Sequence, residues 1–270
     1  MKITRVLAPN PGMFTGSGTN AWLVESDGEV AIIDSGPEIE EHLQAIREAI
    51  GELEPVAVLV THCHLDHVQS ANKMAADLGV PCMGSCPGPA FKPDRVLADG
   101  DEVEVGAVTI EVIGTPGHTP HHVCYRIGDA LFTGDHIMGG TSVIVEHMSD
   151  YLDSLKKIQG VGLTMLYPGH GAPMEDPDEV IQWYLDHRLE RERQIVEAIE
   201  GGAPTVGGIV EACYLDVDPA LHPLAARSVG AHVRKLAEEG MVDLPLGSSD
   251  WSSPVVFPAV VDEVDEAEQS

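Results

Sequence analysis

The sequence is poor in basic residues and has no long apolar run. Its 270 residues include 15 Lys and Arg against 44 Asp and Glu, so the formal net charge at pH 7 is −29. A surface of this sign repels nucleic acid and anionic membranes unless a metal or a local basic patch reverses the field. No stretch approaches the roughly twenty apolar residues that a membrane span needs. The composition therefore argues against nucleic acid and membranes as partners.

The sequence also shows no targeting segment and no CxxC motif of the kind found in zinc knuckles and redox proteins. Residues 1–7 enter a strand-like run directly, without an apolar targeting region or a cleavage site, so we expect a cytoplasmic protein. The five Cys residues show no CxxC spacing. We therefore expect reduced thiols in a reducing compartment, with Cys63 serving only in packing.

The first part of the chain alternates strands with helices. Its apolar content is ordinary, at 43% of the whole chain, so a sizeable core can form. Strands are predicted at 21–24, 30–34, 56–60, 101–113 (in two pieces), 123–127, 130–133 and 163–167. Helices are predicted at 39–50, 68–78 and 149–158, and a loop at 81–95. Residues 1–175 are therefore predicted to form an α/β domain.

The character of the chain changes near residue 176. Helices are predicted at 178–200, 206–214 and 219–239, followed by a short strand at 240–243. Such an arrangement resembles a winged-helix module, and a helical cap packed on the main domain is an equal alternative. We expect this small helical domain to cover 176–245 and an acidic, partly disordered tail to cover 246–270.

Four potential metal ligands follow the predicted strand 56–60, which is apolar without alternation and thus typical of a strand buried on both faces. They lie in the run Thr61-His62-Cys63-His64-Leu65-Asp66-His67. Unpaired imidazoles and carboxylates are costly in a core, whereas His nitrogen and Asp oxygen are normal zinc ligands. His62 and His64 can converge on one position, while Asp66 and His67 can face a second one.

Ligand-type residues also follow three later strands, each beside Gly or Pro. They are His118, Asp135 and His170. Active sites in layered α/β folds gather on loops at strand ends. The sequence therefore predicts that these residues converge with the 61–67 run on one site.

Together these motifs resemble the metallo-β-lactamase superfamily. The 61–67 run matches its HxHxDH signature, and Gly117-His118-Thr119, Gly134-Asp135 and Gly169-His170-Gly171 follow in the family's order. The resemblance covers about residues 1–175 and is nearest to the glyoxalase II side, among lactamase-like endoribonucleases and thioesterases with a winged-helix-like C-terminal domain. It implies an α/β fold, the αββα sandwich, with a dinuclear metal site at one edge.

Carried over position by position, the resemblance implies seven metal ligands. The first metal takes His62, His64 and His118, the second takes Asp66, His67 and His170, and Asp135 bridges the two. Asp34 would orient a ligand His, and His121 and His122 would surround the site or lie at the surface. Two zinc ions per chain are expected, and Mn or Fe suits the same donors.

The expected activity is hydrolysis of a small acyl substrate, namely a thioester, ester or lactone. A hydroxide that bridges the two metals is the nucleophile, and Asp66 is the catalytic residue that orients it and relays a proton. Segments 12–14, 81–95 and 138–141 are candidate pocket walls. A homodimer could form through the C-terminal helices or an exposed apolar loop.

Three alternatives stay open at this point. A metal-dependent endoribonuclease fits the nearest group but not the charge of −29. A mononuclear iron persulfide dioxygenase would need only His62, His118 and Asp135, so the other ligands argue against it. A non-catalytic binding role would normally accompany lost ligands, and none is missing.

Overall fold

The computed structural model describes residues 1–139, 142–203, 205–215 and 217–243. The chain divides into two compact units, Met1–His187 and a second that begins at Arg188. The predicted tail at 246–270 lies outside the described residues, and the domain ranges 1–175 and 176–245 stay a prediction. In the described part of the chain, none of the helices combines the length and the apolar character needed to span a bilayer.

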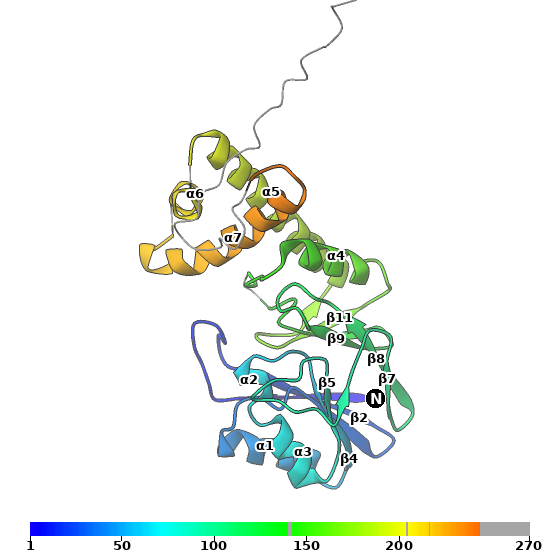
Figure 1. Ribbon diagram of the computed structural model, residues 1–270. Coiled ribbons are helices and arrows are strands. Elements are labelled where there is room, and N and C mark those ends of the chain that lie inside the picture. The colour runs from blue at the N-terminus through cyan, green and yellow to red at the C-terminus, as the bar shows by residue number, and fades with distance from the viewer. Residues whose placement is uncertain (140–141, 204, 216, 244–270) are drawn as a thin grey trace, which may run out of the picture. The chain divides into compact units, whose positions relative to one another are not determined.

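The first unit contains two six-stranded sheets (Figure 1). The first sheet has the strand order β1 (Lys2–Leu7), β2 (Asn20–Ser26), β3 (Glu29–Ile33), β4 (Glu54–Val60), β5 (Cys82–Gly84) and β6 (Arg95–Val96). The second has the order β12 (Met174–Glu175), β11 (Met165–Pro168), β10 (Ala130–Gly134), β9 (Val123–Ile127), β8 (Val108–Gly114) and β7 (Glu102–Val105). Both are mixed: β3 to β6 run parallel, as do β10 and β11, and the other neighbours are antiparallel.

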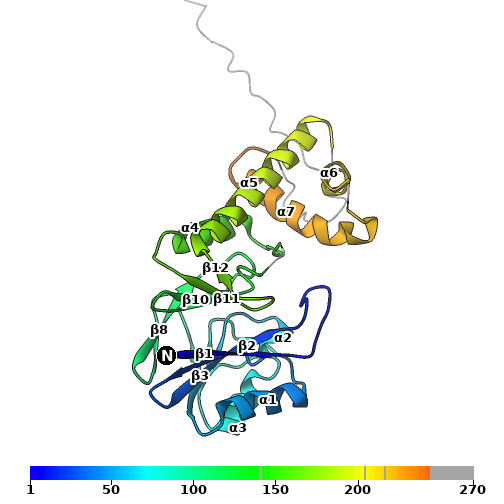
Figure 2. The ribbon, with the colours of Figure 1, turned by 180° about the vertical axis from the view of Figure 1, so that it is seen from behind.

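The layers follow from strands that are apolar on both faces. In β4, Val58 and Val60 pack with helices α1 (Glu40–Ile50) and α3 (Ala71–Leu78), while Ala57 and Leu59 pack in the core between the two sheets. Helix α4 (Met148–Ile158) lies outside the second sheet (Figures 1 and 2). This arrangement confirms the αββα sandwich and the prediction of a doubly buried strand.

Two predictions in this unit were wrong in detail. The expected helix 68–78 is interrupted, and α2 (Leu65–Val68) precedes α3. At the break, the Ser70 hydroxyl bonds the Gly36 carbonyl and the Ser35 hydroxyl, so its side chain is used outside the helix. The expected loop 81–95 begins with β5, which pairs with β4. A strand of three residues is too short to show a period in the sequence.

The second unit contains the end of α5 (Pro177–Glu200), followed by α6 (Val206–Cys213), a 3-10 turn (Pro219–Leu221) and α7 (His222–Glu238). Ile195, Ile209 and Val233 are buried in its core. Where a strand was predicted at 240–243, the chain up to Val242 forms a turn, because the Met241 amide bonds back to the Leu236 carbonyl after Gly240 adopts a positive φ of 72°.

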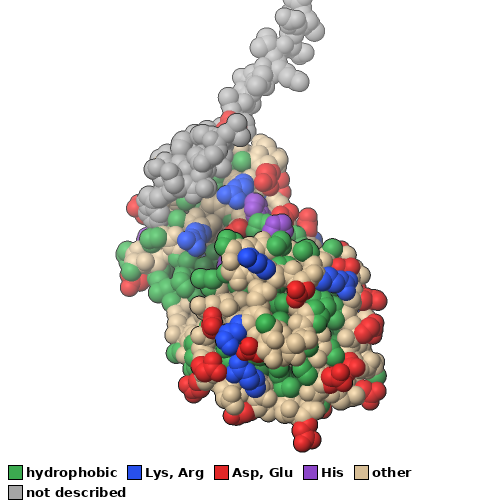
Figure 3. Space-filling view, turned by 60° about the horizontal axis from the view of Figure 1, so that its bottom comes forward, with side chains coloured by type: hydrophobic (Ala, Val, Ile, Leu, Met, Phe, Trp, Pro, Cys, Tyr) green, Lys and Arg blue, Asp and Glu red, His purple; other side chains and the backbone are tan. Residues whose placement is uncertain are grey.

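Acidic side chains dominate the charged surface. On the face shown in Figure 3 they are spread around the outline, with fewer Lys and Arg between them. This distribution agrees with the net charge of −29.

Candidate metal centre

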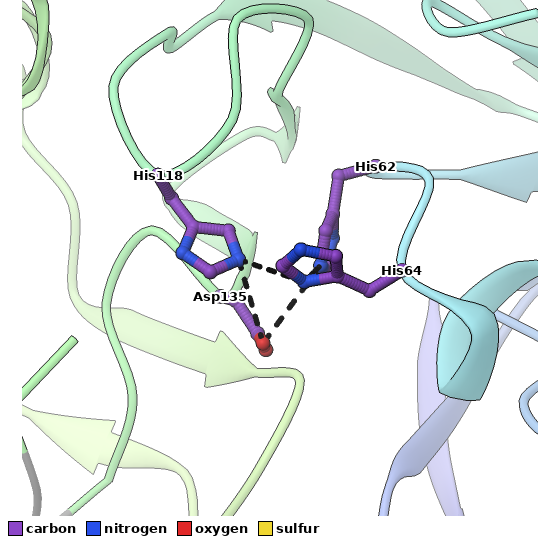
Figure 4. A group of neighbouring side chains, drawn as sticks. All are labelled: His62, His64, His118 and Asp135. Carbon is purple, nitrogen blue, oxygen red and sulfur yellow. Dashed lines mark hydrogen bonds and ion pairs between the residues drawn. The ribbon is translucent and has the colours of Figure 1, made fainter. Parts of the chain in front are cut away.

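All seven predicted ligands meet where strands of both sheets end. The first sheet supplies the 61–67 run after β4, and the second supplies His118, Asp135 and His170 after β8, β10 and β11. The side chains form two groups, and within each group the candidate ligand atoms lie within 4.8 Å of one another. One group is His62, His64, His118 and Asp135 (Figure 4), and the other is Asp66, His67 and His170.

The first group brings three imidazole nitrogens and a carboxylate oxygen together. His62 Nε2 and His118 Nε2 lie 3.0 Å and 3.1 Å from His64 Nδ1. Asp135 Oδ2 lies 3.8 Å from both His62 Nε2 and His118 Nε2. Neighbouring ligands of a tetrahedral zinc ion with bonds of about 2.1 Å are about 3.4 Å apart. The donor set and its spacing therefore fit one divalent metal.

The second group lies on the other side of Asp135. Asp66 Oδ2 is 3.4 Å from His67 Nε2 and 3.3 Å from His170 Nε2. Asp135 Oδ1 is 3.4 Å from each of the same two nitrogens. The two oxygens of Asp135 thus face different groups, and this carboxylate could hold two metals at once.

Hydrogen bonds on the far side of the rings determine which nitrogen faces the site and is available to a metal. His67 Nδ1 donates to Asp34 Oδ2 at 2.9 Å, His118 Nδ1 to the Ile144 carbonyl at 2.6 Å, and His170 Nδ1 to the Gly18 carbonyl at 3.2 Å. A neutral imidazole that donates from Nδ1 accepts at Nε2. These three rings therefore present Nε2 to the site, as metal ligands do when an outer partner fixes the tautomer.

Asp34 organises the first sheet's contribution to the site. Its Oδ2 accepts from the Thr61 hydroxyl at 2.7 Å and its Oδ1 from the Thr61 amide at 2.8 Å. Because the Thr61 hydroxyl donates to Asp34, it accepts from His62 Nδ1 at 3.0 Å, which leaves His62 Nε2 as the acceptor. Asp34 has a positive φ of 54° and is buried, a strained conformation at a functional position.

The two groups differ in charge. Burial, together with the charge of His67, lowers the pKa of His62 well below its ordinary value. Burial and the charge of His118 lower the pKa of His64 to about 4. In the second group burial also opposes protonation, but hydrogen bonds to Asp135 and Asp66 outweigh it and raise the pKa of His170 to about 9. The charges of Asp135 and Asp34 likewise raise the pKa of His67 despite its burial.

The carboxylates remain ionised. Burial would raise the pKa of Asp66, but its hydrogen bond with His170 and the charge of His67 lower it. The same balance, led by the charge of His67, lowers the pKa of Asp135 despite its burial. Without metal, protonated His67 and His170 therefore supply the positive charge that balances these carboxylates.

Close packing leaves no room for a side chain at Gly169. A Cβ atom there would lie 2.6 Å from Asp135 Oδ1 and 2.7 Å from His67 Cε1. The glycine before His170 therefore allows the backbone after β11 to approach both groups.

Several residues of the site escaped the sequence analysis. The Thr19 hydroxyl donates to Asp66 Oδ2 at 3.0 Å, and the Gly18 carbonyl bonds His170. The side-chain amide of Asn20 donates to the Pro168 and Gly171 carbonyls at 2.9 Å each. These bonds hold the loop that carries His170. The contacts of Gly18 and Asn20 join positions about 150 residues apart, and that of Thr19 with Asp66 joins positions 47 apart. Only the glycine-rich loop before them hinted at a special backbone.

The extra histidines lie as expected. His121 is exposed, while His122 is buried with its Nδ1 bonded to the Thr115 hydroxyl at 3.0 Å.

The prediction of five reduced thiols was wrong: Cys63 and Cys86 form a disulfide with Cα atoms 5.9 Å apart. Cys82, Cys124 and Cys213 are free. The alternation of side chains along the 61–67 run correctly predicted that Cys63 packs away from the ligands. It could not show that segment 85–94 brings a second cysteine beside it.

Comparison with known proteins shows the family to which this fold belongs. The family model described as the metallo-beta-lactamase superfamily matches residues 14–81 and 73–170, and that of the beta-lactamase associated winged helix domain matches 205–251. The chain belongs to the metallo-β-lactamase superfamily, carries a C-terminal winged-helix domain and is a metallo-hydrolase.

Named relatives match along most of the chain. A Caenorhabditis elegans protein named beta-lactamase-like protein 2 homolog is 30% identical over 259 residues, which cover 90% of this chain and 86% of that protein. The atrochrysone carboxyl ACP thioesterase nsrC of Aspergillus novofumigatus is 34% identical over 261 residues, or 89% of this chain and 80% of that protein. A metallo-beta-lactamase family protein of Thermus thermophilus shares the fold, with a TM-score of 0.77 and 20% identity. The match covers 95% of this chain and 98% of that protein.

Proposed function

We propose that this chain is a dinuclear metal-dependent hydrolase of small acyl substrates, with thioesters as the first candidates. The observation that carries the proposal is the position of Asp135, whose two oxygens face two separate groups of ligand-type atoms. The similarity to a protein named as a carboxyl ACP thioesterase supports the choice of a thioester.

The donor set suits two zinc ions, held by His62, His64 and His118 in one group, by Asp66, His67 and His170 in the other, and by Asp135 in both. Manganese or iron suits the same nitrogen and oxygen donors. Bound metals would supply an electrophile for the substrate carbonyl and lower the pKa of water toward 7.

Asp66 is the proposed catalytic residue. It is partly exposed, in contrast to the buried Asp135, so a water and a substrate can reach it. Its lowered pKa keeps it a carboxylate that can accept a proton, and the Thr19 hydroxyl holds its Oδ2 at 3.0 Å. We propose that Asp66 orients the attacking water, takes its proton and passes it to the departing atom.

Exposed apolar side chains lie close in the chain to residues at this end of the site. Met13 and Phe14 are 73% and 58% exposed on the loop that leads to Gly18 and Thr19, and Leu65 precedes Asp66 with 61% exposed. Large apolar side chains at such exposure next to ionised groups fit a surface that receives an apolar acyl group. Segments 12–14 and 81–95 stay proposed pocket walls, and residues 140–141 of the third wall lie outside the described residues.

The proposal is tested by a thioester series with metal-loaded protein. We expect release of thiol and carboxylic acid, with kcat/KM about tenfold higher for long apolar acyl groups than for acetyl because an apolar side chain buried on binding contributes about 1.5–3 kcal/mol. Asp66→Asn should lower kcat by about 10²-fold or more. Asp150→Asn, which changes an acidic residue in the first turn of α4, is the matched control. Cleavage of RNA without turnover of any thioester, ester or lactone would contradict the proposal.

A further inference from the structure

His64 differs from the other four candidate ligand histidines in how its ring is held. Those four rings are each bonded on the outward Nδ1, by Thr61, Asp34, Ile144 and Gly18. His64 faces the site with Nδ1, and within the described residues no hydrogen-bond partner meets its outward Nε2. The residue is also exposed. Something other than an outer hydrogen bond must therefore fix its direction.

The disulfide adjoins this histidine. Cys63 lies between His62 and His64 and is bonded to Cys86, 23 residues further along the chain. Cys86 is buried in the core cluster with Phe91, so its position is held by packing. The segment that follows is tied to α3, because the Asn72 side chain donates to the Lys92 carbonyl and accepts from the Lys92 amide. The backbone that carries His64 is thus anchored covalently to the packed body of the domain.

The same segment reaches the second sheet's share of the first group. The Ser85 hydroxyl, next to Cys86, donates to the carbonyl of His121, three residues after His118. Cys86 and Ser85 therefore connect the backbone beside His64 with the backbone beside His118. In the second group, His67 and His170 are held by Asp34 and by the Gly18 carbonyl, which do not involve this segment.

We propose that the Cys63–Cys86 disulfide is a positioning crosslink that holds His64 in the first ligand group, so that its reduction weakens metal binding there and spares the second group. The inference rests on the metal centre of the proposed function. Cys63 is only partly buried whereas Cys86 is buried, so Cys63 is the more exposed of the two bonded residues. A dithiol would attack Cys63 Sγ, release Cys86 as a thiolate that takes up a proton, and close to a cyclic disulfide as Cys63 leaves as a thiol.

The test separates the two groups by substitution. His170→Ala leaves the first group complete, and His118→Ala leaves the second group with Asp135. Zinc dissociation constants are measured by competition with a chromophoric chelator, before and after treatment with a water-soluble phosphine, which becomes the phosphine oxide as the disulfide becomes two thiols. We expect reduction to weaken zinc binding about tenfold in His170→Ala and less than twofold in His118→Ala.

Cysteine variants in the His170→Ala background show whether this bond is responsible. Cys63→Ser/Cys86→Ser should bind zinc weakly with or without phosphine, while Cys213→Ser, which removes a free thiol of the second unit, should respond as its parent does. Thermal unfolding followed by circular dichroism establishes that each variant is folded.

Different failures have different meanings. Five free thiols in the protein purified in air, equal weakening of both groups, or zinc binding indifferent to reduction would each overturn the crosslink and leave the proposed function intact. Absence of zinc binding in both redox states would contradict the proposed function and, with it, this inference.

Discussion

Asp135→Asn is expected to reduce the metal content from two ions to one or fewer per chain and to lower kcat/KM for a thioester by at least about 10³-fold. The amide keeps the size of the carboxylate, but its nitrogen carries two hydrogens and no lone pair for a metal. Since Oδ1 and Oδ2 face different groups, one group must lose its ligand in either orientation of the amide. A 10³-fold loss corresponds to about 4 kcal/mol of transition-state stabilisation. Metal analysis and thiol release measure the two effects on the same samples.

The matched control is Asp129→Asn. Asp129 is exposed beside the start of β10 and accepts a hydrogen bond from the Thr164 hydroxyl at 2.7 Å, at the end of that strand away from Asp135. The same chemical change should there leave metal content and kcat/KM within about twofold, as surface substitutions usually do. Retention of both metals and full turnover in Asp135→Asn would show that this carboxylate does not join the two groups.

The second large effect is a difference in pH dependence between the two groups. Because the pKa of His170 is raised to about 9 and that of His67 is also raised, both rings are protonated at neutral pH and metal must displace these protons. The apparent affinity of the second group should therefore increase by tenfold per pH unit for each proton displaced, between pH 6 and 8. The pKa values of His62 and His64 are lowered, so these rings are already neutral and contribute no such dependence.

The measurement is the zinc dissociation constant of each group at pH 6, 7 and 8, in variants that keep one group. His170→Ala retains the first group and His118→Ala retains the second, where His67 and His170 titrate. The affinity in His118→Ala should increase by at least about 10²-fold across this range, and more steeply than in His170→Ala. Equal slopes in the two variants would refute the assignment of the displaced protons to the second group.

The ligand-type residues of the site could be predicted from the sequence, whereas the residues that hold them in place could not. The HxHxDH run and the later Gly-His and Gly-Asp motifs are local patterns, and the structure brings their seven ligand-type residues together. The doubly buried strand 56–60 was likewise visible as an apolar run without alternation. Each single motif, like the strand, depends on residues close together in the chain.

What the sequence did not show depends on contacts between distant segments. Gly18 meets His170 only after the two sheets pack together, and Thr19 meets Asp66 only after β2 and β4 join one sheet. The break between α2 and α3 follows from hydrogen bonds of Ser70 to Ser35 and Gly36. The Cys63–Cys86 disulfide needs the fold of segment 85–94, and its cysteines carry no spacing signal.

Whether the site is a dinuclear hydrolytic centre is decided by the metal content per chain. Protein purified without added metal would be analysed for all transition metals, and the same sample would be assayed for thioester hydrolysis. We expect two divalent ions per chain, with zinc the expected ion, and turnover that disappears when a chelator removes them. One iron per chain with oxygen uptake on a persulfide, or hydrolysis that persists without metal, would contradict it.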